Sequence, residues 1–347
     1  EILDKSLIGI NNLIKSHDRI INSKIYNIDK IYWLIEDCKK FGTSSFASIA
    51  RCAFIANDFI NSFEEKKILT KEEKLKFLAS IKTVVSEMNY DLIKLNKKNF
   101  INKYGHLRPS TYDINSVNYK NGYKNYFFEG KIDKKVKNNS FKFNKLQINK
   151  IEDYIKKNKL PFNALKLIKF IRTGISEREK SKFYFSKNID SVFNLMKKIG
   201  KRNSIDVKDL GYINIKTILD LYYNLDIKTL EEKLKKEISY NKQMYKYNTL
   251  IKLPQNILSE KDIFFFTEKL PKSNFVGMGD VTGKIVHVEK ISKTKLENKI
   301  VCIASADPGY DYIFSRKIKG LITMFGGINS HMAIRCSELG IPAAIGV

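Results

Sequence analysis

The last segment of the chain, GGINSHMAIRCSELGIPAAIGV over Gly326–Val347, constrains the fold more than any other part of the sequence. Its two opening glycines permit a sharp turn, and the apolar spacing over Ser330–Leu339 predicts a short amphipathic helix. The Gly-Ile-Pro that follows ends this helix. His331 then lies in the first helical turn. The candidate residues of this turn and helix are Gly326, Gly327, Asn329, Ser330, His331 and Arg335.

The start of a helix is a favourable place for an anion. Unpaired backbone N–H groups and the positive end of the helix dipole stabilise a negative charge there by about 0.3–1 kcal/mol. The same dipole predicts a neutral, nucleophilic ring for His331, with Asn329 or Ser330 capping the helix or contacting a phosphate. Arg335, one turn further on, either assists or is merely exposed. The alternative is a helix-capping histidine without chemistry.

This segment resembles the swivelling phosphohistidine domain of phosphoenolpyruvate synthase, pyruvate phosphate dikinase and rifampin phosphotransferase. The resemblance extends upstream through GDVTGKIVHVEK at Gly279–Lys290 and NKIVCIASADPGYDYIF at Asn298–Phe314. It implies that His331 is the phosphoryl-carrying nucleophile. Short β-type runs at 283–288, 300–304 and 320–325 predict strands with helices packed on their sheet.

The expected fold is multidomain: a mainly α-helical acceptor-binding domain over residues 1–270, then a mixed β/α swivelling domain over 271–347. The change from helical to β-type pattern at about 253–278 suggests a linker. The resemblance implies that the swivelling domain continues beyond Val347, and that an ATP-grasp domain upstream of Glu1 in the same full-length protein binds ATP and Mg²⁺. No Walker A sequence occurs here.

Helical signals run through the first two thirds of the chain. Thr70 and Glu73 form a predicted capping box, and apolar residues at helical spacing follow as far as Leu95. Pro161 precedes a long helical pattern, and further helices are expected over 215–225 and 228–245. The lysine-rich stretch 115–149 is predicted to be a loop or excursion.

The formal charge of +26 would ordinarily suggest a protein that binds nucleic acid or an anionic membrane. The lysines, however, are spread over solvated helix faces beside acids. This pattern does not favour nucleic acid, although a non-catalytic polyanion-binding protein stays an alternative, with Lys131–Lys150 as its surface. Four cysteines without metal-ligand spacing predict reduced thiols in a cytoplasmic protein and no metal site. No apolar run is long enough for a membrane segment.

The richest polar cluster of the helical region is YGHLRPSTYDINS. Its His106, Arg108, Tyr112 and Asp113 are candidates for acceptor binding. Arg108 can pair with a carboxylate and Asp113 with an ammonium group. The alternative is a structural loop in which Arg108 and Asp113 hold each other.

Two further segments supply candidates. Arg51 stands on an otherwise apolar helix, where burial would demand an anionic partner, either a structural one or a ligand. The segment 175–188 offers Arg178, Glu179 and Lys182, which are predicted to form mostly a solvated face, with acceptor contact by Arg178 as the alternative.

These three segments resemble a bacterial branch of the same family, whose described member is the L-glutamine kinase of capsule phosphoramidate synthesis. The resemblance implies that ATP phosphorylates His331 with release of AMP and phosphate, and that His331 then phosphorylates the side-chain amide nitrogen of L-glutamine. The alternatives within the family are a phosphoenolpyruvate synthase-like enzyme and an antibiotic phosphotransferase of the rifampin type.

Overall fold

The computed structural model describes residues 1–127, 140–223, 230–251, 253–254, 257–265, 273–277, 279–288, 295–328 and 330–347. The helices of the first half are α1 (Ile2–Asn22), α2 (Asn27–Asp37), the π-helical turn η1 (Cys38–Thr43), α3 (Ser44–Glu65), α4 (Lys71–Ala79), α5 (Val84–Lys94), α6 (Lys97–Tyr104), α7 (Tyr119–Tyr126) and α8 (Lys145–Lys157). They are followed by α9 (Ala164–Arg202), η2 (Leu210–Tyr212), α10 (Ile215–Asp220), α11 (Leu230–Asn248) and η3 (Glu260–Ile263). The last part contains β1 (Asn274–Val276), β2 (Ile285–His287), β3 (Ile300–Ser305), η4 (Pro308–Arg316), β4 (Gly320–Phe325), α12 (His331–Leu339) and β5 (Ala343–Ile345).

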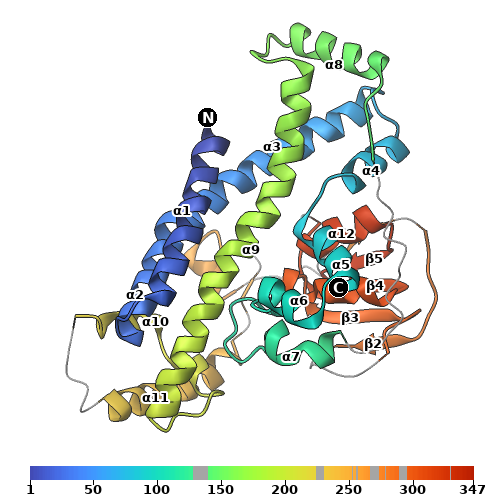
Figure 1. Ribbon diagram of the computed structural model, residues 1–347. Coiled ribbons are helices and arrows are strands. Elements are labelled where there is room, and N and C mark those ends of the chain that lie inside the picture. The colour runs from blue at the N-terminus through green and yellow to red at the C-terminus, as the bar shows by residue number, and fades with distance from the viewer. Residues whose placement is uncertain are drawn as a thin grey trace.

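The long helix α9 organises the helical part. It lies along α1, α2 and α3, and α8 crosses its N-terminal end (Figure 1). One apolar core joins α9 to α2, α10 and α11, and a second joins it to α3, α4 and α8. Two cores along one 39-residue helix make α9 a rigid support for the half-buried residues of its middle.

The helix predicted after Thr70 is interrupted. The capping box of Thr70 and Glu73 is confirmed, but α4 ends at Ala79 and α5 begins after a second capping box, made by Thr83 and Ser86. The predicted loop at 115–149 also contains α7 and the start of α8, while residues 128–139 of that stretch lie outside the described residues. Residues 131–139 of the proposed polyanion surface lie outside them as well.

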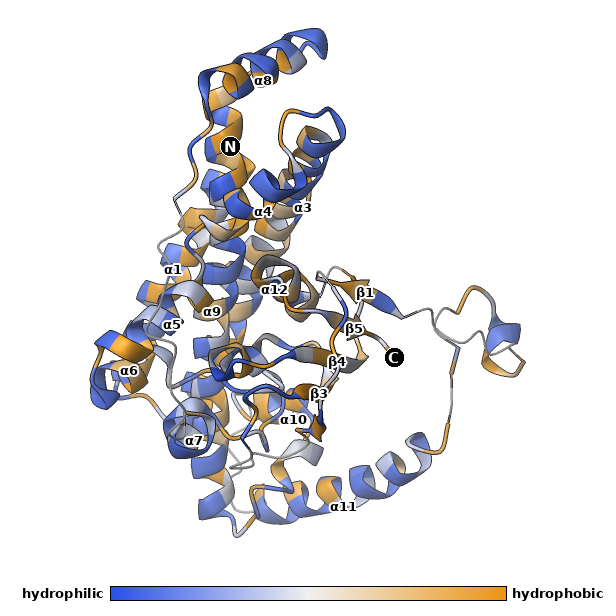
Figure 2. Cartoon of the chain, turned by 90° about the vertical axis from the view of Figure 1, so that its right-hand side faces the viewer, coloured by the Kyte–Doolittle hydropathy of each residue, from blue (hydrophilic) through white to orange (hydrophobic). Residues whose placement is uncertain are grey.

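The carboxy-terminal part is built on a sheet with the strand order β1-β5-β4-β3-β2. The four strands β2 to β5 are parallel, and β1 pairs antiparallel with β5. The three predicted strands are confirmed as β2, β3 and β4, and the predicted helix is confirmed as α12 between β4 and β5. Figure 2 shows mainly apolar ribbon along the strands and mainly hydrophilic ribbon along α4. A helical part followed by a mixed α/β part is therefore the observed fold class.

A third apolar core joins the sheet to α5, α6 and α7. The Tyr119 hydroxyl donates a hydrogen bond to the Gly309 carbonyl (2.9 Å), and the ring centroids of Tyr126 and Tyr312 lie 5.0 Å apart. These contacts attach residues of the expected acceptor-binding domain to the histidine-bearing part. The division at residue 270 therefore stays a prediction. Within the described ranges, no helix combines the length and apolar content that crossing a membrane requires.

Candidate active site

His331 is the first residue of α12, directly after the N-cap Ser330, and the helix ends at Gly340 in the left-handed conformation. The turn from β4 depends on Gly326, whose φ is +140° and whose Cβ, if present, would lie 2.8 Å from the Ala306 Cβ. A Cβ on Gly327 would meet no atom within 4 Å. The backbone thus requires the first glycine, whereas the second leaves open space at the start of the helix.

Two carboxylates hold the imidazole of His331. Its Nε2 lies 2.7 Å from Asp311 Oδ1, and its Nδ1 lies 3.2 Å from Glu179 Oε2. Asp311 belongs to η4, in the same part of the chain as His331, whereas Glu179 belongs to α9. His331 is only 8% exposed, so both contacts are shielded from water.

This arrangement favours the charged ring. Burial alone would lower the pKa of His331, but the carboxylates of Asp311 and Glu179 outweigh it and raise the pKa to about 10. Burial alone would raise the pKa of Glu179, and the neighbouring His331 instead lowers it. The expectation of a neutral His331 ring is therefore wrong for this arrangement, because two buried carboxylates act more strongly than a helix dipole of a fraction of a charge.

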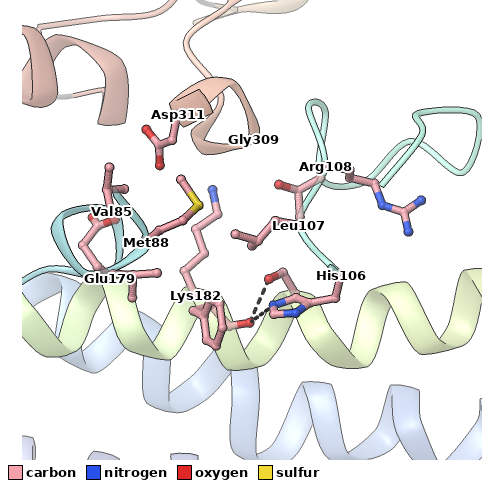
Figure 3. A pocket seen from close by; sticks show the side chains of 13 residues that line it. Val85, Met88, His106, Leu107, Arg108, Glu179, Lys182, Gly309 and Asp311 are labelled. Carbon is pink, nitrogen blue, oxygen red and sulfur yellow. Dashed lines mark hydrogen bonds between the residues drawn. The ribbon is translucent and has the colours of Figure 1, made fainter. Parts of the chain in front are cut away.

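Cationic side chains surround the histidine. Arg178 stacks over Phe54, with 5.6 Å between its guanidinium carbon and the ring centroid, and Arg335 of α12 is buried at 7% exposure rather than exposed. Lys182 extends from α9 toward Gly309 and Asp311 (Figure 3), and it forms no ion pair with any residue that the structure describes. The segment predicted to be mostly a solvated face therefore faces the histidine.

Two clefts meet at His331, Glu179 and Arg178. The strand-end cleft, of about 400 Å³, lies between α9 and the ends of β3 and β4. It is also lined by Phe46, Lys182, Ser305, Ala306, Asp307, Phe325, Gly326 and Ser330. The α3 cleft, of about 410 Å³, lies between α3, α4 and α9 on one side and β1 and α12 on the other. A small cavity of about 40 Å³ lies beside Glu179, Lys182 and Asp311 (Figure 3).

The α3 cleft contains unused hydrogen-bonding capacity. Asn57 lines it, and its side chain makes no hydrogen bond with the described residues. Lys74, also in the lining, is held by Glu64 (2.6 Å) and Asn61 (2.8 Å). Apolar side chains such as Ile60, Leu78, Ile175 and Ile328 complete the walls.

The acceptor residues predicted in the loop do not meet His331. Arg108 is buried, forms an ion pair with Asp190 and donates to the Ser116 carbonyl (3.1 Å), and Figure 3 shows its side chain directed away from the small cavity. The alternative, in which Arg108 and Asp113 hold each other, is also wrong, because Arg108 pairs with Asp190 and Asp113 accepts from the Asn115 backbone N–H (2.8 Å). Neither residue lines the two clefts.

The remaining candidates are scattered. His106 borders the small cavity, donates to the Phe183 carbonyl (3.0 Å), and has its pKa lowered to about 3 by burial. Tyr112 is 64% exposed, and Arg51 is exposed on α3, contrary to the expected burial. Asn329 lies outside the described residues. Ser330 Oγ is buried and has no hydrogen-bond partner among the residues described.

Sequence reasoning did not identify Asp311, although it lies in the ADPGYDYIF motif, and it did not connect Glu179 with His331. Both contacts depend on tertiary packing that no local pattern signals. Within the described ranges there is no group of three His, Cys, Asp or Glu side chains suited to a metal ion.

A histidine at a helix start, after a glycine turn and in a cleft that Arg178 and Lys182 also line, suits a phosphohistidine. Residues 295–347 match the family described as "PEP-utilising enzyme, mobile domain". This match confirms the predicted resemblance of the carboxy-terminal part to the superfamily of phosphoenolpyruvate synthase, pyruvate phosphate dikinase and rifampin phosphotransferase.

Two relatives match a larger part of the chain. Rifampicin phosphotransferase of Bacillus cereus is 33% identical over 144 residues, which cover 38% of this chain and 16% of that protein. The protein of the same name in Bacillus subtilis is 30% identical over 142 residues, covering 37% of this chain and 16% of its own length. The chain thus spans about a sixth of the length of the curated relatives that it matches.

Proposed function

We propose that this chain is the carrier and acceptor part of an ATP-dependent phosphotransferase, in which His331 holds a phosphoryl group and passes it to a small acceptor bound against α9. The observation that carries the proposal is the position of His331, at the start of α12 and in a cleft that Arg178 and Lys182 also line. A phosphohistidine there would meet N–H groups and two cations.

The proposed roles follow from this geometry. Asp311 orients the ring through Nε2 and travels with it, because both residues lie in the carboxy-terminal part. Arg178 and Lys182 stabilise charge on the phosphoryl oxygens during transfer, an effect worth about 10²–10³ in rate for one well-placed donor. Ser330, whose hydroxyl has no partner among the described residues, is a further donor to those oxygens.

ATP is the proposed phosphoryl donor, with AMP and phosphate as products. It binds, together with Mg²⁺, in an ATP-grasp domain elsewhere in the complete protein. His331 must then move between two sites, which a swivelling domain permits. The docked arrangement, with His331 against α9, corresponds in this proposal to the acceptor side of the cycle.

L-glutamine is the proposed acceptor. Each cleft at His331 has the volume of a small-molecule site and combines charged and hydrogen-bonding groups. In the α3 cleft, the unpaired amide of Asn57 and the ammonium of Lys74 suit the polar ends of an amino acid. These residues replace Arg108 and Asp113 as the acceptor-binding candidates.

A rifampicin-like antibiotic is the second candidate acceptor. Two matching relatives are named rifampicin phosphotransferase, and the walls of the α3 cleft are largely apolar. An ansamycin needs a broad apolar surface, whereas L-glutamine needs partners for its carboxylate and ammonium groups.

Phosphorus NMR of the complete protein with ATP and Mg²⁺ tests the proposal, in parallel samples with L-glutamine and with rifampicin. AMP and a new phosphorus–nitrogen resonance with L-glutamine, both lost in His331→Ala, would support the glutamine kinase proposal. A phosphate ester formed only with rifampicin would transfer the proposal to the second acceptor. Failure to consume ATP in either sample would contradict the phosphotransferase proposal and favour a binding protein.

A further inference from the structure

The two carboxylates that hold His331 face different surroundings. Asp311 borders the small cavity but neither of the two clefts. Glu179 borders the small cavity and both clefts. An acceptor in either cleft therefore lies on the side of Glu179, not of Asp311.

The other carboxylates near the clefts are less suitable as a base. In the strand-end cleft, Asp307 already accepts from the Gly309 backbone N–H (2.7 Å) and from the Thr111 hydroxyl (3.3 Å). Among the described residues that line the α3 cleft, Glu179 is the only carboxylate. Its one ion pair with a side chain in the described ranges is the contact with His331.

We propose that Glu179 is the general base of the transfer from phosphorylated His331 to the acceptor, and that it takes no part in loading His331 from ATP. This inference rests on the proposed function. The different roles of the two carboxylates follow from their positions in the chain. Asp311 accompanies His331 wherever the carboxy-terminal part moves, whereas Glu179 stays on α9 and meets the histidine only in the docked arrangement.

The transfer balances in atoms and electrons. The bond between phosphorus and a ring nitrogen breaks, and its electron pair stays on the imidazole. A bond forms between phosphorus and the acceptor nitrogen or oxygen, whose proton passes to the Glu179 carboxylate. Glu179 then gives this proton to the ring, which becomes a neutral imidazole, and a second proton taken from solvent restores the imidazolium and carboxylate pair observed here.

Phosphorylation of His331 changes the pKa of Glu179 in the direction that a general base requires. With His331 charged, the neighbouring imidazolium lowers the pKa of Glu179 against the effect of burial. A phosphoryl group on the ring replaces that positive charge with a negative one, so burial then raises the pKa of Glu179. Glu179 becomes a stronger base when the carrier is loaded and a weaker one after transfer.

Separate measurement of the two half-reactions in the complete protein tests the inference. Glu179→Gln keeps the shape of the side chain, and Glu177→Gln is its matched control, because Glu177 lies on the same helix and pairs only with Lys180 (2.7 Å) among the described residues. Loading is followed as acid-labile phosphate formed from ATP. Discharge is followed in a single turnover with L-glutamine and with rifampicin as acceptor probes.

We expect Glu179→Gln to load at the rate of wild type and to discharge about 10²–10⁴-fold more slowly, without the rise in discharge rate with pH that the inference predicts for wild type. Glu177→Gln should match wild type in both steps. Discharge by Glu179→Gln at the rate of the control would overturn the inference, as would an equal loss of loading and discharge, which indicates a structural role. If wild type itself forms no acid-labile phosphate, the proposed function fails, and this outcome is distinct from either result.

Discussion

Nδ1 of His331 lies 3.2 Å from Oε2 of Glu179, so the helix that carries the histidine is tied by charge to the long helix α9. The contact is largely buried, with the two side chains 8% and 20% exposed. Because it joins the two parts of the chain, a change of charge on the histidine changes the contact between them. A phosphoryl group on His331 would remove the positive charge on which this contact depends.

The first prediction concerns the pH dependence of stability. His331 has a raised pKa, so its stabilising contribution is fully present below its ordinary value of 6.5 and is lost as pH rises toward about 10. Glu179 has a lowered pKa, so its contribution is present above its ordinary value of 4.5 and is lost as pH falls. The pair therefore stabilises the fold most between these two ordinary values.

Urea unfolding of His331→Gln and wild type checks this prediction. The difference in unfolding free energy should be larger at about pH 6 than at about pH 10. The matched control is His287→Gln, since His287 is exposed on β2. A difference for His331→Gln that is the same at both pH values would contradict the charged contact.

The second prediction concerns Arg108. Its side chain is 2% exposed and pairs with Asp190, so Arg108→Ala would leave a buried carboxylate without its cationic partner. We expect a loss of about 3–5 kcal/mol in unfolding free energy. Arg51→Ala, at an exposed position of α3, should change it by no more than about 0.5 kcal/mol. Unchanged stability of Arg108→Ala, together with a raised acceptor KM, would restore Arg108 to the acceptor site.

The third prediction separates two lysines on α9. Lys182 lines the strand-end cleft, whereas Lys180 pairs with Glu177 and lines neither cleft. Lys182→Ala should slow phosphoryl transfer to the acceptor by about 10²–10³-fold, because one cation facing the transferred group is lost. Lys180→Ala should leave the rate close to that of wild type. Equal rates for the two variants in single-turnover assays would exclude Lys182 from the site.

The fourth prediction separates the two glycines of the turn. Gly326→Ala forces a side chain into a positive φ and against Ala306, so the midpoint of thermal unfolding should fall by several degrees, as expected for about 1–3 kcal/mol of strain. Gly327→Ala meets no atom and should leave that midpoint nearly unchanged. If Gly327→Ala nevertheless slows loading or discharge, the space beside it is needed by a bound phosphoryl group. A larger loss of stability for Gly327→Ala would contradict the described turn.

Local patterns predicted much of the fold. The capping box at Thr70, the strands β2 to β4 and the helix that begins at His331 each depend on neighbouring residues, and each is observed. The break between α4 and α5 was missed, because apolar spacing continues across Ser80–Thr83 while Ser86 replaces the acidic or amide residue usual in a capping box. Short strands such as β1 and β5 carry too few residues for a period to appear.

The candidate site was harder to predict, because its partners are distant in sequence. His331 was found from its own motif, but Asp311 and Glu179 reach it only through packing of η4 and α9. Arg108 is predicted from its own segment to pair with an acceptor carboxylate or, as the alternative, with Asp113, whereas the folded chain brings Asp190 to it. A local pattern identifies a reactive residue type, and tertiary contacts decide its charge.

The most direct test of the central claim is the intact mass of the complete protein after incubation with ATP and Mg²⁺ in the absence of acceptor. Wild type should gain one phosphoryl group that is lost in acid, maps to the peptide containing His331, and disappears on addition of the acceptor. His287→Gln should gain the same group, and His331→Gln should not. Absence of an acid-labile phosphoryl group in wild type, or its presence in His331→Gln, would contradict the account.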